Sequence, residues 1–233
     1  MSDARKKNEE REPGDAGEYW RCTLIEVATR LRVGRGIGQN ETEAAIELWQ
    51  GVRQRTGREL PPPLVSDGWG GHREALVEVF GQVPAYSGHG RPPTQKQVGE
   101  NWLYLQMVKK RDNGRVIATE VRLIYGNPQQ AEALLQQHTA YVERTNLTSR
   151  HMTGRLVRKT LGFSKQVEML RAATTWEDVI YNWARAVKTL RVEVNDGERR
   201  WLPRSPAMVA GLTDHLWTIE DLLWHVPTPT NRL

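Results

Sequence analysis

The chain has 233 residues, 38% of them hydrophobic, which is enough for one large domain with a buried core. No apolar run approaches the ~20 residues of a membrane span, and the polar N-terminus excludes a secretory signal. The chain has one cysteine, Cys22, which excludes an intramolecular disulfide and a cysteine-based zinc site, so we expect a cytoplasmic protein. The net charge of +5 is a weak indication of a polyanionic partner.

The N-terminal part of the chain predicts a tail followed by a strand pair and a helix. Residues 1–18 are polar and contain glycine and proline, a composition typical of a mobile tail. Residues 19–27 and 31–33 are rich in β-formers and predict a hairpin of two strands. Asn40 is a good N-cap for a helix that ends at Gly57, with Glu43 as its capping-box partner.

The next part predicts a short strand, a helix and a second hairpin. Residues 64–66 form an apolar strand that stops at Asp67, and a helix is expected over 72–80. Residues 81–99 are dense in glycine and proline and predict a loop. The runs 102–109 and 115–125 flank Asn113-Gly114, the strongest short-range signal for a β-hairpin.

The C-terminal part is mainly helical. Asn127 as cap and Pro128 at the first helical position predict a helix. Residues 141–186 read as helical with interruptions near Gly154 and Gly162, and the tail carries one further helix over 219–224. The order of elements predicts an α/β layer fold in which helices pack on a mixed sheet.

Two carboxylates stand out by position. Asp67 follows the apolar strand and precedes three glycines, which would let a ligand approach the backbone closely. The alternative is that Asp67 makes a turn or caps the following helix. Glu143 opens a predicted helix, where the helix dipole alone favours an acidic residue.

The positive charge is concentrated between Arg144 and Arg171. Seven basic residues there face one acidic residue, which gives +6 and accounts for the whole excess of the chain. Such a segment is the footprint expected of a nucleic-acid surface, whereas the alternative is a solvated helix face. Its members proposed for DNA contact are Arg144, Arg150, Arg155, Arg158, Lys159 and Lys165.

The block 141–150, together with 154–165, resembles the signature of bacterial insertion-sequence transposases of the DDE type, in the group named after insertion sequence one. Residues 66–69 (Ser-Asp-Gly-Trp) resemble the second catalytic block of that group, and the similarity extends over roughly residues 19–224. The resemblance implies an RNase H-like core over 19–195, with a C-terminal tail over 196–233 and a helical extension.

The resemblance also implies the chemistry of the site. Asp67 would be the second and Glu143 the third acid of an Asp-Asp-Glu triad, both catalytic and both ligands of Mg²⁺ or Mn²⁺. Two such cations about 4 Å apart activate the attacking oxygen and stabilise the leaving oxygen when DNA strands are cut and transferred. The partner would be the DNA ends of an insertion element, and Arg150 stands where many members carry a basic residue.

One departure from the family pattern concerns the first acid. In the family it lies on the opening strand just before a Lys-Lys pair, which Lys6-Lys7 match here, so that strand would precede Met1. We therefore expect a core incomplete at its N-terminus and an inactive or impaired transposase. The alternative is a non-catalytic DNA-binding remnant of a transposase, and the sequence leaves a homodimer open.

Overall fold

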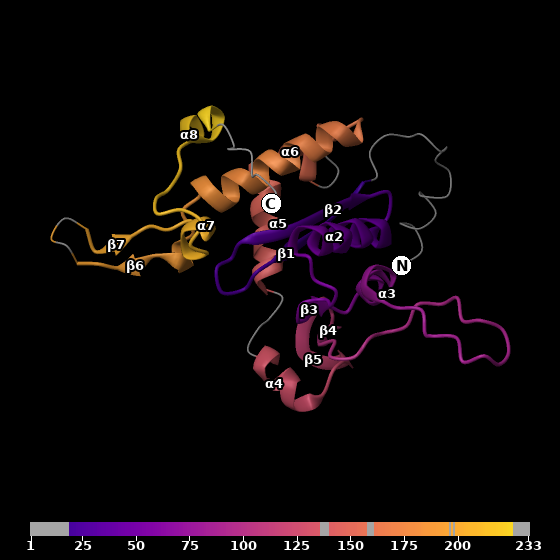
Figure 1. The fold of residues 1–233 in the computed structure, drawn as a ribbon. Helices are drawn as coiled ribbons and strands as arrows, with labels where there is room; N and C mark the ends of the chain where they lie inside the picture. The colour runs from indigo at the N-terminus through magenta and orange to yellow at the C-terminus, as the bar shows by residue number, and fades with distance from the viewer. Residues whose placement is uncertain (1–18, 136–139, 158–160, 196, 198, 226–233) are drawn as a thin grey trace. The chain divides into compact units, whose positions relative to one another are not determined.

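The computed structural model describes residues 19–135, 140–157, 161–195, 197 and 199–225 (Figure 1). The expected tail over residues 1–18 lies outside the described residues. The described chain is a mixed α/β protein whose strands form three small sheets. The mixed α/β class expected from the sequence is confirmed, although the strands are divided among separate sheets.

The first sheet pairs β1 (Trp20–Ile25) with β2 (Arg32–Gly38). Strand β2 extends five residues beyond the expected end at residue 33, through a glycine-rich stretch that sequence patterns assign to loops. A Cβ atom on Gly36 would lie only 1.8 Å from the carbonyl oxygen of Ala44. Glycine is therefore required because helix α2 lies directly against the backbone of β2.

Helix α2 (Glu41–Thr56) begins and ends where the sequence predicts. The side chain of Asn40 accepts a hydrogen bond from the backbone N–H of Glu43, and Gly57 ends the helix with φ +63°. The carboxylate of Glu43 accepts from the backbone N–H of Gln39 and the side chain of Asn40, so the reciprocal contact of the capping box reaches one residue further back than expected.

The second sheet has the order β3-β4-β5, with β3 (Leu64–Asp67) parallel to β4 (Tyr104–Asp112) and β4 antiparallel to β5 (Arg115–Tyr125). The predicted β4–β5 hairpin is confirmed. Its turn residues Asn113 and Gly114 both have positive φ, as the tightest hairpin turns require.

Strand β4 separates two hydrophobic clusters. On one face Tyr104 joins the larger cluster, built mainly from α2 and α3 (Gly71–Phe80). On the other face Leu105 packs with Ala131 and Leu134 of α4 (Pro128–Leu135). The expected cap of α4 is confirmed, because Asn127 accepts a hydrogen bond from the backbone N–H of Gln130 at 2.8 Å.

The rest of the chain is mainly helical, as expected. Its elements are α5 (Ala140–Met152), the 3₁₀ turn η1 (Gly154–Leu156), α6 (Val167–Val179), the π-helical turn η2 (Ile180–Ala184), η3 (Lys188–Leu190), the short hairpin β6 (Val192–Glu193) and β7 (Trp201–Leu202), α7 (Pro206–Val209) and α8 (Ile219–Trp224). The sequence patterns indicate neither η3, nor the β6–β7 hairpin, nor α7.

The contacts divide the chain into two compact units. Of the described residues, those within 19–24 and 33–170 belong to the first unit, and those within 25–32 and 171–225 belong to the second. The boundary expected at residue 195 remains a prediction. No helix among the described residues is both long and apolar enough to cross a membrane.

We predict that Gly36→Ala destabilises the protein by roughly 2 kcal/mol, because the new methyl group would overlap the backbone of α2. Gly70→Ala is the matched control, since nothing lies within 4 Å of a Cβ atom at that position. Urea unfolding followed by circular dichroism measures both. Equal midpoints for the two variants would contradict the close packing of β2 on α2.

Candidate functional site

Asp67 is the last residue of β3 and its side chain is exposed. Its carboxylate accepts a hydrogen bond from the backbone N–H of Trp69 at 3.2 Å, which closes a turn directly after the strand. Helix α3 has Gly70 as its N-cap, with no side-chain cap. Of the two local alternatives left open by the sequence, the structure therefore shows the turn and not the helix cap.

A buried polar network fixes the end of β3. The hydroxyls of Ser66 and Tyr104 share a hydrogen bond of 2.8 Å. The side-chain amide of Gln106 donates to the hydroxyl of Tyr104 at 2.9 Å and to the carbonyl oxygen of Trp69 at 3.0 Å. Because Gln106 holds the Trp69 carbonyl, strand β4 positions the turn that carries Asp67.

The carboxylate of Asp67 acts electrostatically on three neighbouring groups. Burial, with a smaller contribution from the negative charge of Asp67, raises the pKa of the Cys22 thiol to about 12. Burial also raises the pKa of Tyr104, with a smaller contribution from Asp67. Burial lowers the pKa of His72, and Asp67 opposes that effect. A thiol with so high a pKa stays protonated at neutral pH, so Cys22 is not an activated nucleophile.

Glu143 lies in the first turn of α5, exposed, and forms an ion pair with Lys109 of β4. In the register of the sheet, Asp67 lies beside Met107, two residues before Lys109 on the same strand. Alternate residues of a strand share a face, so Asp67, Met107 and Lys109 belong to one face of the sheet. Strand spacing and rise place the Cα atoms of Asp67 and Lys109 roughly 8 Å apart.

The two predicted acids are thus linked through one strand, by the β3–β4 register and by the Lys109 ion pair. That their carboxylates share one site remains a prediction.

The donor set does not fit a two-metal centre. Among the described residues no group of three or more His, Cys, Asp or Glu side chains could hold a metal ion. The carboxylate of Glu143 is already engaged by an ammonium group, and two hard cations need several oxygen ligands.

The described part of the basic segment is exposed. Glu143 and Arg150 are seven residues apart on α5, so they lie on the same side of the helix about 10 Å apart. Arg155 donates a hydrogen bond to the buried hydroxyl of Ser164 at 3.1 Å, which ties the segment after α5 to the residues before α6. Arg158 and Lys159 lie outside the described residues. The exposed basic side chains of the described segment within the first unit are Arg144, Arg150, Arg155 and Lys165.

Sequence reasoning missed Lys109 as a site residue. It was assigned only to a strand of the hairpin, and no local pattern links a strand lysine to a glutamate 34 positions later. The alternation of side chains in β4 is the one available signal. Residues two positions apart in a strand share a face, so Lys109 is expected on the same face as Met107.

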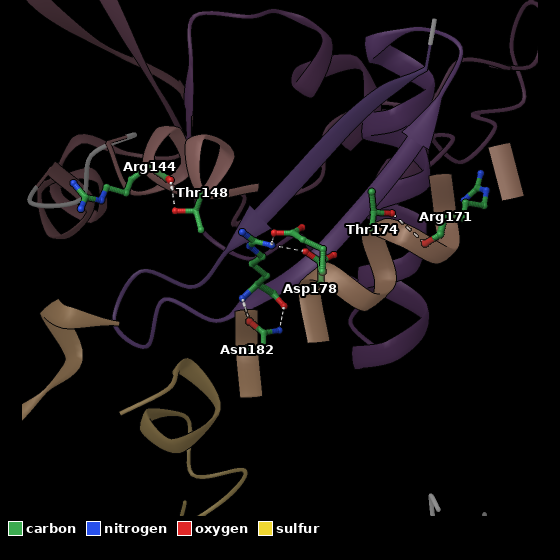
Figure 2. A network of polar contacts seen from close by, with 8 residues as sticks. Arg144, Thr148, Arg171, Thr174, Asp178 and Asn182 are labelled. Atoms are coloured by element: carbon green, nitrogen blue, oxygen red, sulfur yellow. Dashed lines mark hydrogen bonds and ion pairs between the residues drawn. The ribbon is translucent and has the colours of Figure 1, made fainter. Parts of the chain in front are cut away.

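Sequence reasoning also missed a buried ion cluster in the second unit. The guanidinium of Arg32 contacts the carboxylates of Glu177 at 2.5 Å and Asp178 at 2.9 Å, and it lies 3.8 Å from the centre of the Tyr181 ring. Asn182 accepts from the backbone N–H of Arg32 and donates to its carbonyl oxygen. Asp178 of α6 and Asn182 of the π-helical turn, both labelled in Figure 2, thus hold Arg32 by its guanidinium and its backbone.

Comparison with known proteins adds no relative: neither a protein-family model, nor a curated protein, nor a solved structure matches this chain.

We predict that Tyr104→Phe lowers the free energy of unfolding by about 1 to 3 kcal/mol, because Ser66 and Gln106 lose a buried partner. Tyr125→Phe is the control, since the buried hydroxyl of Tyr125 has no hydrogen-bond partner in the described chain. Removing that group should be neutral or stabilising. Chemical denaturation of both variants is the measurement, and a larger loss for Tyr125→Phe would refute the network.

Proposed function

We propose that this chain is a DNA-binding protein of the transposase type that does not itself cut and rejoin DNA. The observation that carries the proposal is the Lys109–Glu143 ion pair beside an exposed basic helix. The RNase H-like fold belongs to the same proposal. It is supported by the mixed three-stranded sheet and by the position of Asp67 at the end of a β-strand.

Exposed arginine and lysine side chains support the DNA-binding part. Arg144 and Arg150 lie on α5, and Arg155 and Lys165 follow within the same unit. Cationic side chains release the counterions condensed on DNA phosphates, which drives binding without base recognition. No feature of the described residues indicates sequence readout, so we propose backbone contacts as the main interaction.

The electrostatics of Glu143 support the absence of catalysis. A divalent cation at Glu143 would have to displace the ammonium group of Lys109 or remain beside it. Either arrangement is unfavourable, because like charges at a few ångströms repel and the ion pair is lost. The lysine therefore takes the electrostatic role at Glu143 that a metal ion would have in a DDE centre.

DNA binding can be tested by its dependence on salt. The affinity for duplex DNA of arbitrary sequence should fall steeply as salt rises. Replacing Arg150 and Lys165 together by glutamine should reduce the slope of log affinity against log salt by about two units. Replacing Arg58 and Arg91, also exposed but outside the segment, removes the same net charge and should leave the slope nearly unchanged. Equal slopes for both double variants would mean that the segment is only a solvated face.

Catalysis can be tested by a nicking assay on supercoiled plasmid DNA with Mg²⁺ or Mn²⁺. We expect no cleavage above the background of a protein-free sample, because the described acids do not make a two-metal site. The variants Asp67→Asn and Glu143→Gln should behave like the parent chain. Cleavage that disappears in both variants would show an active nuclease and overturn the non-catalytic proposal.

A further inference from the structure

Strand β5 is the longest strand of the described chain and lies at the edge of its sheet. It spans eleven residues and is hydrogen-bonded to β4, with no further strand beyond it among the described residues. Backbone N–H and C=O groups on the outer side of an edge strand can pair with another strand. An edge of this length is therefore a surface on which a partner strand can form a continuous ladder.

The side chains of β5 are largely uncovered and partly apolar. Ile117 is 66% exposed and Val121 40% exposed, and Leu123 is exposed on the same face as Val121. Proteins usually protect an exposed apolar edge with charges or bulges. Register shifts occur near both ends of β5, whereas the stretch from Ala118 to Leu123 pairs with β4 without interruption.

The charges of β5 are complementary to those of a second copy. Glu120 contacts Arg122 at 2.8 Å and Lys110 at 3.1 Å, and these groups hold the pKa of Glu120 down to about 2, so it is ionised. If two copies of β5 pair antiparallel about Val121, each Glu120 lies opposite the Arg122 of the other copy. Pairing about Glu120 or about Arg122 would instead place like charges opposite each other, which is unfavourable.

We propose that the chain forms a symmetric dimer by antiparallel pairing of β5 with β5 of a second copy, centred on Val121. The sheet then has six strands, and the two-fold axis passes between the Val121 residues. On one face Val121 meets its own copy and Leu123 lies opposite Thr119. On the other face Glu120 and Arg122 form two reciprocal ion pairs. A self-complementary patch of this kind is what a two-fold interface requires.

Analytical ultracentrifugation of the full chain, with charge-reversal variants, tests the proposal without DNA. The parent chain should show a monomer–dimer equilibrium that shifts with protein concentration. Glu120→Arg makes positions 120 and 122 both basic and Arg122→Glu makes them both acidic, so each variant should be monomeric. The double variant Glu120→Arg with Arg122→Glu exchanges the charges and should dimerise again. Circular dichroism should be the same for all four proteins, because Arg122 is exposed and Glu120 is not buried.

Mixing the two single variants gives the most specific result. The basic edge of one variant then meets the acidic edge of the other, so two monomeric proteins should associate in a one-to-one ratio. A parent chain that stays monomeric up to the limit of its solubility would overturn the proposal. So would a dimer that neither single substitution weakens, or a double variant that fails to associate, because each outcome is incompatible with pairing about Val121.

Discussion

Strand β4 contributes buried side chains to two hydrophobic clusters, one on each of its faces, and this constraint determines the arrangement of the first unit. Tyr104 and Gln106 turn toward Ser66 and the cluster of α2 and α3, whereas Leu105 turns toward α4. A shift of one residue would exchange the two faces and bury the wrong side chains. The register of β3 against β4 is therefore fixed, and with it the position of Asp67 beside Met107.

The same strand explains the electrostatic character of the site. From Lys109 onward the strand lies outside the core and carries charged side chains. Lys109 is the first of these and forms the ion pair with Glu143. Both groups are partly exposed, so the ion pair contributes little to stability. Its effect is instead local, because it places the positive charge of one lysine against the carboxylate of Glu143.

The second unit has its own constraint in the buried guanidinium of Arg32. A buried charge is tolerated only when it is paired and hydrogen-bonded, and here Glu177 and Asp178 supply the opposite charge. Asn182 holds the backbone of the same residue from the π-helical turn. A π-helical turn redirects side chains, and this one brings Asn182 to the first residue of β2.

The sequence by itself determined the α2 cap at Asn40, the Asn113-Gly114 turn and the helix start at Pro128, because each depends on neighbouring residues and backbone geometry. It also selected Asp67 and Glu143, whose shared function is still a proposal. Only the tertiary structure decided that Gly36 belongs to a strand, that Lys109 pairs with Glu143 and that Arg32 is buried. These features arise from contacts between residues far apart in the chain, where close packing and charge pairing override local preference.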